Sequence, residues 1–174
     1  MKLFKKFAIR LILVVTLVLF LVGCDQATKQ AAYKQLKDNP KTEIAGIVHL
    51  QYIENDGGML SLGSKLPQEI KFIIFILVVS VFLVLLFSYI IKNLRDSLLK
   101  HLALIFIFSG GLGNLIDRVF NNGNVIDFIS IKLPLIESGI FNIADFYATM
   151  GFIMLLLTLL TKQKVLSQEK DISI

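Results

Sequence analysis

The sequence is poor in the residues that usually hold small secreted or metal-binding domains together. Its 174 residues include one cysteine, two histidines, three prolines and no tryptophan. A single cysteine cannot form an internal disulfide, which excludes a disulfide-stapled domain. His49 and His101 lie far apart, and no Cys/His cluster has zinc spacing. No nucleotide-binding motif is present either, so we expect a protein without a metal or a cofactor.

The composition indicates a membrane protein rather than a soluble one. Apolar residues make up 55% of the chain, which exceeds the usual share in soluble domains. The net charge of +5 could indicate a nucleic-acid-binding protein, but the basic residues flank apolar runs instead of forming one patch. We therefore expect a membrane-lipid environment and no nucleic-acid partner.

Four apolar stretches predict four transmembrane helices within a single membrane domain, residues 1–174. They cover about residues 7–24, 72–91, 102–116 and 143–160. A hydrocarbon core of about 30 Å requires about 20 helical residues. The first and third stretches are shorter than this, so we expect their helices to extend into polar flanks.

The charges orient these helices across the membrane. Segments 1–10, 92–101 and 161–174 hold ten Lys or Arg residues and three Asp or Glu residues. Segments 25–69 and 117–147 hold seven Lys or Arg residues and ten Asp or Glu residues. Because basic loops stay in the cytoplasm, both termini should be cytoplasmic. Residues 25–69 and 117–142 should then be extracytoplasmic.

The first of these outer segments predicts a small β-sheet. Thr42–Gly63 is rich in Ile, Val, Leu and Tyr, and it contains the turn signal Asp56-Gly57-Gly58. Open sheet edges cannot be satisfied in lipid, so the sheet should rest on the outer interface. Asp25–Leu36 could either continue the first helix or form a surface helix. The predicted fold class is therefore an integral membrane protein, mainly α, with four transmembrane helices and a small extracytoplasmic β-sheet cradle.

Several polar residues lie where these helices meet the outer face, and most of them have an ordinary structural interpretation. Asp25 could end a helix or cap the next one. Asn55 could be a turn residue. The glycines near Gly110 could simply allow close helix packing. Asp117 and Arg118 could form a local ion pair.

Asp127 and Asp145 fit an ordinary structural role least well. Each is flanked by apolar residues, and neither has a Lys or Arg within four positions. If two carboxyl groups meet in a poorly hydrated site, both cannot ionise, and one pKa rises. One carboxylate can then activate a water while the protonated partner polarises a carbonyl. This is aspartyl protease chemistry, and it belongs to the pair rather than to an assigned member.

Five motifs in order carry a resemblance to a known family. They are Asp25-Gln26-x-Thr28-Lys29, Asn55-x-Gly57, Gly110-x-x-Gly113-Asn114-Leu115-x-Asp117-Arg118, Val125-x-Asp127-Phe128 and Phe141-Asn142-x-Ala144-Asp145. Together they resemble the lipoprotein signal peptidases, also called signal peptidase II. The resemblance implies that Asp127 and Asp145 are the catalytic pair. It also implies that a further set of residues contacts the substrate: Asp25, Asn55, Asn114, Arg118 and Asn142. Asp117 matches the motif, but we expect it to be structural.

The resemblance also implies a function and a location. The protein would be an aspartyl endopeptidase of the bacterial cytoplasmic membrane, with its active site at the outer face. Its substrates would be prolipoproteins with a diacylglyceryl-modified Cys, and it would remove the signal peptide by cutting just before that Cys. One departure from the family is visible: Asn55-Asp56-Gly57-Gly58-Met59-Leu60 stands where many members have Asn-x-Gly-Ala-Ala-Phe. A second glycine could loosen this turn and alter the pocket wall.

Two other interpretations remain open. Leu21-Val22-Gly23-Cys24 follows a basic and apolar N-terminus, as in a lipoprotein that is itself processed at Cys24. Three later apolar stretches argue against this, so we interpret Cys24 as a small apolar residue at a helix end. Alternatively, the carboxylates could serve a small four-span transporter or structural membrane protein. A transporter site should lie near the bilayer midplane, whereas these carboxylates are predicted at one face.

Overall fold

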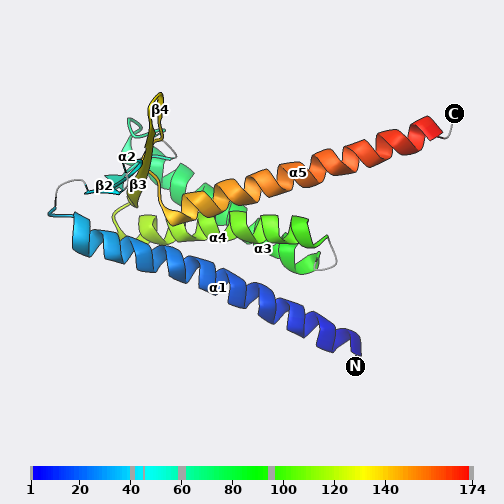
Figure 1. Cartoon of the computed structure of the whole chain (residues 1–174). Helices are drawn as coiled ribbons and strands as arrows, with labels where there is room; N and C mark the ends of the chain where they lie inside the picture. Colours follow the sequence, from blue (N-terminus) through cyan, green and yellow to red (C-terminus); the bar gives the residue numbers. More distant parts are fainter. Residues whose placement is uncertain (1, 40–41, 45, 59–61, 94–96, 173–174) are drawn as a thin grey trace.

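The computed structural model describes the backbone of residues 2–39, 42–44, 46–58, 62–93 and 97–172 (Figure 1). Its helices are α1 (Lys2–Leu36), α2 (Gln68–Phe72), the π-helical segment η2 (Ile73–Val78), α3 (Val79–Lys92), α4 (Leu98–Phe120) and α5 (Ile143–Ile172). Its strands are β1 (Thr42–Ile44), β2 (Val48–Asn55), β3 (Val125–Leu133) and β4 (Ile136–Glu137).

The predicted mainly helical membrane fold is confirmed. Within the described residues, four helical stretches are long and apolar enough to cross a membrane: Phe7–Leu36, Gln68–Lys92, Leu98–Phe120 and Ile143–Thr161. The two short stretches do extend into polar flanks, as expected. The first helix runs past Cys24 to Leu36, because its next turns bury Asp25, Lys29 and Ala32.

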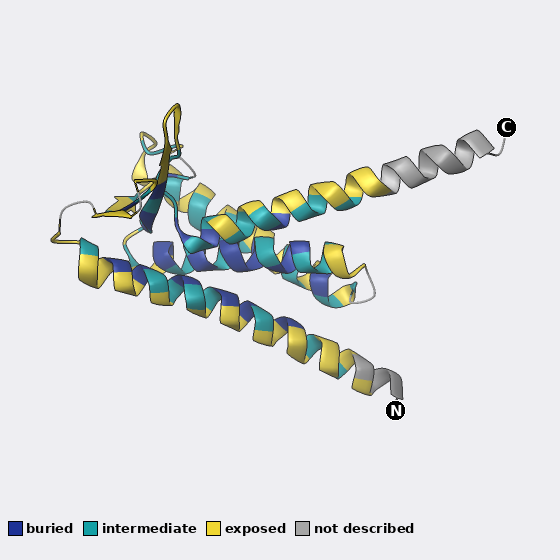
Figure 2. Ribbon diagram, in the orientation of Figure 1, coloured by how far each residue is buried: buried dark blue, intermediate teal, exposed yellow. Residues whose placement is uncertain are grey.

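Helix α4 is the centre of the bundle. It packs against α1, α3 and α5, and it contains many of the buried side chains (Figure 2). Glycines permit this close packing, as one interpretation of the sequence proposed. A Cβ atom at Gly113 would lie 2.6 Å from an oxygen of Asp25, and one at Gly110 would collide with the carbonyl oxygen of Ala144. The glycines therefore bring α1 and the start of α5 onto the C-terminal half of α4.

The opposite faces of the helices are apolar and exposed, as lipid-facing surfaces are. Leu19 on α1, Leu85 on α3 and Phe152 on α5 are all well exposed. The start of α1 and the end of α5 lie at the same end of the bundle, and the sheet lies at the other end (Figure 1). The sheet therefore sits where α1 and α4 end and where α2 and α5 begin.

The sheet is larger than the sequence predicted. Its four strands are antiparallel in the order β1-β2-β3-β4, and β2 pairs with β3 from Val48↔Ile131 to Asn55↔Val125. The prediction placed strands only in residues 42–63. Half of the strands instead come from the connection between α4 and α5. This difference matters for the site, because β3 carries Asp127.

Candidate active site

Asp127 is the third residue of β3, and its carboxyl group is held between two amides. It is 3% exposed, and Val125 and Phe128 beside it are also buried. One carboxyl oxygen accepts a hydrogen bond from Nδ2 of Asn55 at 2.9 Å, and the other accepts from Nδ2 of Asn142 at 2.7 Å. Asn55 reaches this position because it pairs with Val125 at the end of β2. The β2–β3 register therefore sets one side of the site.

Asp145 lies in the first turn of α5 in a reciprocal cap. The backbone N–H of Asp145 donates to Oδ1 of Asn142 at 2.9 Å, and the N–H of Asn142 donates to Oδ2 of Asp145 at 3.2 Å. This is the geometry of a capping box, with Asn and Asp in place of the usual Ser and Glu. The remaining oxygen, Oδ1, accepts a hydrogen bond from Nδ2 of Asn114 at 2.8 Å. Asp145 thus both starts its helix and presents an oxygen beside α4.

Asn142 joins the two carboxyl groups. Its side-chain Nδ2 donates to Asp127 and also to Oδ1 of Asn114 at 3.1 Å, while its oxygen takes the N–H of Asp145. Because Asn142 is completely buried, these contacts are shielded from solvent. A single amide therefore holds β3, α4 and α5 together at the site.

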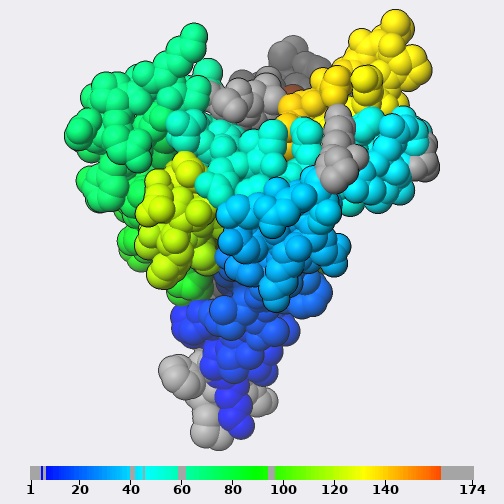
Figure 3. All heavy atoms as spheres, turned by 90° about the vertical axis from the view of Figure 1, so that its left-hand side faces the viewer, coloured from blue at the N-terminus to red at the C-terminus, as the bar shows by residue number. Residues whose placement is uncertain are grey.

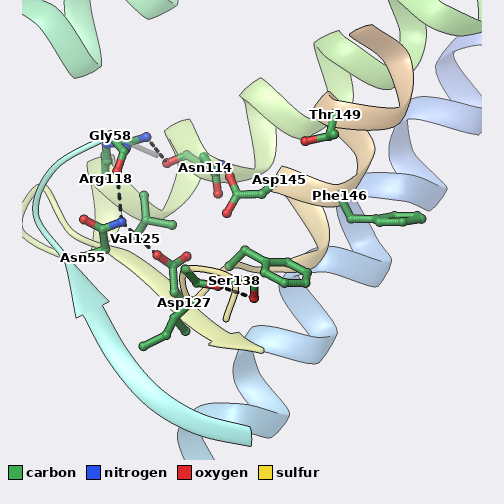
Figure 4. Close-up of a pocket in the computed structure, with 13 residues that line it drawn as sticks. Asn55, Gly58, Asn114, Arg118, Val125, Asp127, Ser138, Asp145, Phe146 and Thr149 are labelled. Carbon is green, nitrogen blue, oxygen red and sulfur yellow. Dashed lines mark hydrogen bonds between the residues drawn. The ribbon is translucent and has the colours of Figure 1, made fainter. Parts of the chain in front are cut away.

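Both aspartates line one cavity, which has a volume of about 290 Å³ (Figure 4). Four residues from the predicted site besides Asp145 face it: Asn55, Asn114, Arg118 and Asp127. The rest of the wall consists of Gly58, Val125, the segment Ser138–Phe141 and the α5 residues Phe146 and Thr149. The cavity therefore brings together residues that are far apart in the sequence, with the two carboxyl groups on its surface.

The surroundings of Asp127 favour its protonated form. Burial, together with the negative charge of Asp145, raises the pKa of this carboxyl from 3.8 to about 6. The hydrogen bonds from Asn55 and Asn142 oppose this effect because they stabilise the carboxylate. A carboxyl group with a pKa near 6 can carry a proton close to neutral pH.

Two of the residues expected to contact substrate lie behind the cavity wall. Asn142 has the linking position just described. Asp25 is completely buried, and one of its oxygens accepts the backbone N–H of Ala144 at 2.9 Å. The structure therefore places Asp25 where it supports the start of α5 rather than on the cavity surface.

A buried cation, Lys29, holds this support together, and the sequence analysis did not assign it a role. It is 1% exposed, and its Nζ lies 2.8 Å from Asp25, 2.9 Å from Asp117 and 3.0 Å from Oδ1 of Asn114. Asp117 also accepts hydrogen bonds from the Gln26 side chain and from a backbone N–H of β3. The sequence did contain a signal for this ion pair, because residues four positions apart on a helix, such as Asp25 and Lys29, lie on the same face.

Arg118 points away from this cluster and toward the turn after β2. Its Nη2 donates to the carbonyl oxygen of Gly57 at 2.8 Å, and its guanidinium lies over the ring of Phe75. Asp117 forms an ion pair with Lys29 rather than with Arg118, so these two sequence neighbours have different partners. Among the described residues, Nε of Arg118 has no hydrogen-bond partner. Phe75 is a second residue that the sequence analysis did not select.

The turn with the additional glycine is tightly held as far as it is described. Oδ1 of Asn55 accepts the N–H of Gly57 at 2.9 Å, and Nδ2 of Asn55 donates to the carbonyl oxygen of Gly58 at 3.1 Å. A Cβ atom at Gly58 would lie 3.3 Å from the ring of Phe75. The ring of Phe75 thus occupies the space that a side chain larger than glycine would need at position 58. Met59 and Leu60 lie outside the described residues.

Comparison with known proteins gives a consistent family. Residues 17–161 match the family model described as signal peptidase (SPase) II. A lipoprotein signal peptidase of Streptococcus thermophilus (strain CNRZ 1066) is 39% identical over 143 residues, which cover 82% of this chain and 88% of that protein. Another, from Streptococcus pneumoniae (strain ATCC BAA-255 / R6), is 36% identical over 152 residues, covering 87% and 94%.

A solved structure agrees with these sequence matches. A bacterial membrane enzyme solved by the in meso method at 2.3 Å resolution superimposes with a TM-score of 0.75 and 30% sequence identity, covering 86% of this chain and 88% of that one. The family match covers most of the chain, and the fold matches over a similar extent. The chain therefore belongs to the signal peptidase II family, and it is a multi-pass membrane protease.

Proposed function

We propose that the protein is an aspartyl endopeptidase that removes the signal peptide from prolipoproteins. Its substrates carry a diacylglyceryl-modified Cys, and the cut falls just before that residue. The observation that carries the mechanism is that Asp127 and Asp145 line one cavity and share Asn142. The substrate follows from the family and from the names of the relatives, which are lipoprotein signal peptidases.

In the proposed reaction the two aspartates share one proton. The ionised member takes a proton from water as the water oxygen bonds to the scissile carbonyl carbon. The protonated member donates its hydrogen to the carbonyl oxygen, and a tetrahedral intermediate forms. When the intermediate collapses, the carboxyl that took the proton from water delivers it to the leaving nitrogen and the C–N bond breaks. One hydroxyl of the intermediate returns its proton to the other carboxylate, so the pair again holds one proton. Titration belongs to the pair, so the acid and base roles are not divided between Asp127 and Asp145.

The polar residues of the cavity suit a peptide held in extended form. A peptide that leaves its helix near the cut exposes amide groups, and these need partners close to the membrane. Asn55, Asn114 and Arg118 line the cavity, and Arg118 alone has five N–H groups. The acyl chains of the substrate would stay in the bilayer, where their buried area adds affinity. We assign Asp25 and Asn142 the task of positioning the catalytic pair.

The proposed orientation places both termini in the cytoplasm and the cavity at the outer face. It rests on the charge difference between the two sets of loops. The arrangement of the helices is compatible with it, because the N-terminal end of α1 and the C-terminal end of α5 lie together at the end of the bundle opposite the sheet (Figure 1). A cut beside a lipidated Cys at the membrane surface requires an active site at this level.

Two observations weigh against the alternatives. Asp127 belongs to β3 and Asp145 to the first turn of α5, so both lie at the sheet end of the bundle rather than at the middle, where a transporter site is expected (Figure 1). Helix α1 buries Val14, Val18 and Leu21 in the core and supplies Lys29 to the site. Loss of residues 1–24, as in a processed lipoprotein, would remove that part of the core.

The test is cleavage of a diacylglyceryl-modified proprotein by purified variants. Asp127→Asn and Asp145→Asn should each lower kcat by at least about 100-fold, the lower range for general acid–base catalysis. Asp56→Asn is the matched control, because Asp56 is an exposed carboxylate that pairs with Lys71 outside the catalytic pair. Thermal unfolding should show that all three variants are folded. Full activity of either catalytic variant would eliminate the aspartyl mechanism.

A further inference from the structure

The hairpin formed by β3 and β4 has an apolar and exposed tip. Residues 131–137 are seven consecutive exposed residues, and five of them are apolar, including Pro134. Leu135 is 95% exposed and Ile136 is 69% exposed, with Leu133 also exposed. Soluble surfaces rarely gather large apolar side chains in this way. The tip therefore needs an apolar partner.

The position of the tip indicates what that partner is. The hairpin projects sideways from the bundle near the level where α5 begins (Figure 1). Viewed along the bundle from the sheet side, it lies at the periphery of the molecule (Figure 3). Phe146 and Phe152 on α5 are also exposed, and α5 is one of the helices that are long and apolar enough to cross a membrane.

The backbone of the hairpin is suited to a poorly hydrated place. Lys132 pairs with Glu137 and Leu133 pairs with Ile136, and the N–H of Ser138 donates to the carbonyl oxygen of Ile131 at 2.8 Å. Pro134, at the turn, has no N–H to satisfy. Few backbone donors would therefore lose a water partner on entering the membrane interface.

We propose that the tip Leu133–Ile136 inserts into the interfacial layer of the lipid leaflet around the start of α5. The occupant of this apolar surface is bilayer lipid, and the surface continues the lipid-facing side of α5. Lys132, at the base of the tip, would remain among the head groups, where a cation is favourable beside anionic lipid. The hairpin would then be an anchor at the interface in addition to the transmembrane helices.

This anchor would have a consequence for the cavity. Ser138–Phe141 follows the hairpin directly and forms part of the cavity wall. A tip held in lipid would fix that wall at the membrane boundary, which is where the scissile bond of a lipidated precursor lies. This consequence rests on the proposed function, whereas insertion of the tip does not.

The absence of tryptophan allows a direct test, because one introduced indole gives the entire tryptophan signal. We would place Leu135→Trp in the full chain and reconstitute it in phosphatidylcholine and phosphatidylglycerol vesicles. Leu85→Trp on α3 is the lipid-exposed control, and Asp38→Trp, in the exposed turn after α1, is the aqueous control. Insertion predicts that the Leu135→Trp emission lies at shorter wavelength than that of Asp38→Trp. It also predicts quenching by lipids with brominated acyl chains and protection from aqueous iodide.

Two results would overturn the proposal. Emission and iodide quenching equal to those of Asp38→Trp would show a tip in water. Short-wavelength emission without quenching by brominated lipid, and with a dependence on the protein-to-lipid ratio, would show contact with a second protein copy. Neither readout uses catalysis, so failure of the anchor and failure of the proposed protease activity are distinguishable.

Discussion

The ring of Phe75 lies under the guanidinium of Arg118, with 5.1 Å between the ring centroid and Cζ. The same ring also borders the turn after β2, since Cβ atoms at Gly58 and Gly63 would lie 3.3 and 3.2 Å from it. Phe75 belongs to the π-helical segment η2, and such segments often occur at functional sites. One aromatic ring therefore supports both the arginine of the cavity and the turn that holds Asn55.

Loss of this ring should impair catalysis more than stability. Phe75→Leu removes a cation–π contact of about 0.5–2 kcal/mol, so we expect kcat/KM to fall by roughly 2- to 30-fold. Phe75→Tyr keeps an aromatic face and should retain most of the activity. Phe72→Leu, one helical turn away and half exposed, is the control. Equal activities of Phe75→Leu and Phe72→Leu would show that Arg118 does not depend on the ring.

Lys29 should be essential for stability. Its replacement by Met leaves Asp25 and Asp117 without their buried cation. Removing one partner of a buried ion pair lowers the free energy of unfolding by about 3–5 kcal/mol. We expect a large fall in Tm for Lys29→Met in detergent solution. Lys34→Met on an exposed part of the same helix should leave Tm nearly unchanged. Similar Tm values for the two variants would contradict a structural role for the Lys29 cluster.

The pH dependence of cleavage should report on the titration of the aspartate pair. The reaction needs one proton on the pair, and the pKa of Asp127 is about 6, so kcat/KM should fall as the pH rises through this region. The hydrogen bond from Asn55 stabilises the carboxylate and thereby lowers this pKa. Asn55→Ala should therefore move the falling limb to higher pH.

The control for this pH profile is Asn124→Ala, because Asn124 bonds to Glu54 at the surface rather than to Asp127. Its falling limb should coincide with that of the parent enzyme. If the falling limb of the pH profile of Asn55→Ala stays in place or moves to lower pH, the Asn55 amide does not favour the charged form of Asp127.

Labelling of single cysteines should establish the orientation. In a Cys24→Ala background, the cysteine of Asp38→Cys should react with an impermeant maleimide added to intact cells. Leu98 is 75% exposed at the other end of the bundle, and the cysteine of Leu98→Cys should react only after the membrane is opened. The opposite pattern would place the sheet and the cavity in the cytoplasm and would reverse the proposed topology.

The sequence predicted the helices well because lipid imposes a strong local constraint. A helix that crosses the membrane must be apolar over about 20 residues, and its pattern is therefore visible without knowledge of its neighbours. The flanking charges likewise predict an orientation from local composition. The apolar neighbours of Asp127 and Asp145 singled out these two carboxylates for a similar reason. Their catalytic role remains a prediction.

Long-range pairing and burial could not be read from the sequence. Strand β3 was missed because its partner β2 lies some 70 positions earlier in the chain, as the Asn55–Asp127 contact shows. Asp25 was expected at the cavity surface, but packing of α1 against α4 puts it behind the wall beside Lys29. Phe75 has no local polar signal, and only the approach of α4 places Arg118 on its ring.

The sequence by itself therefore determined the membrane class, the number and approximate limits of the helices, and the residue types available for chemistry. Only the tertiary structure decided which of these residues meet. Hydrophobicity acts on each segment independently, whereas a site depends on contacts between segments. The register of β2 with β3 and the close packing allowed by Gly110 and Gly113 bring the two carboxyl groups to one cavity.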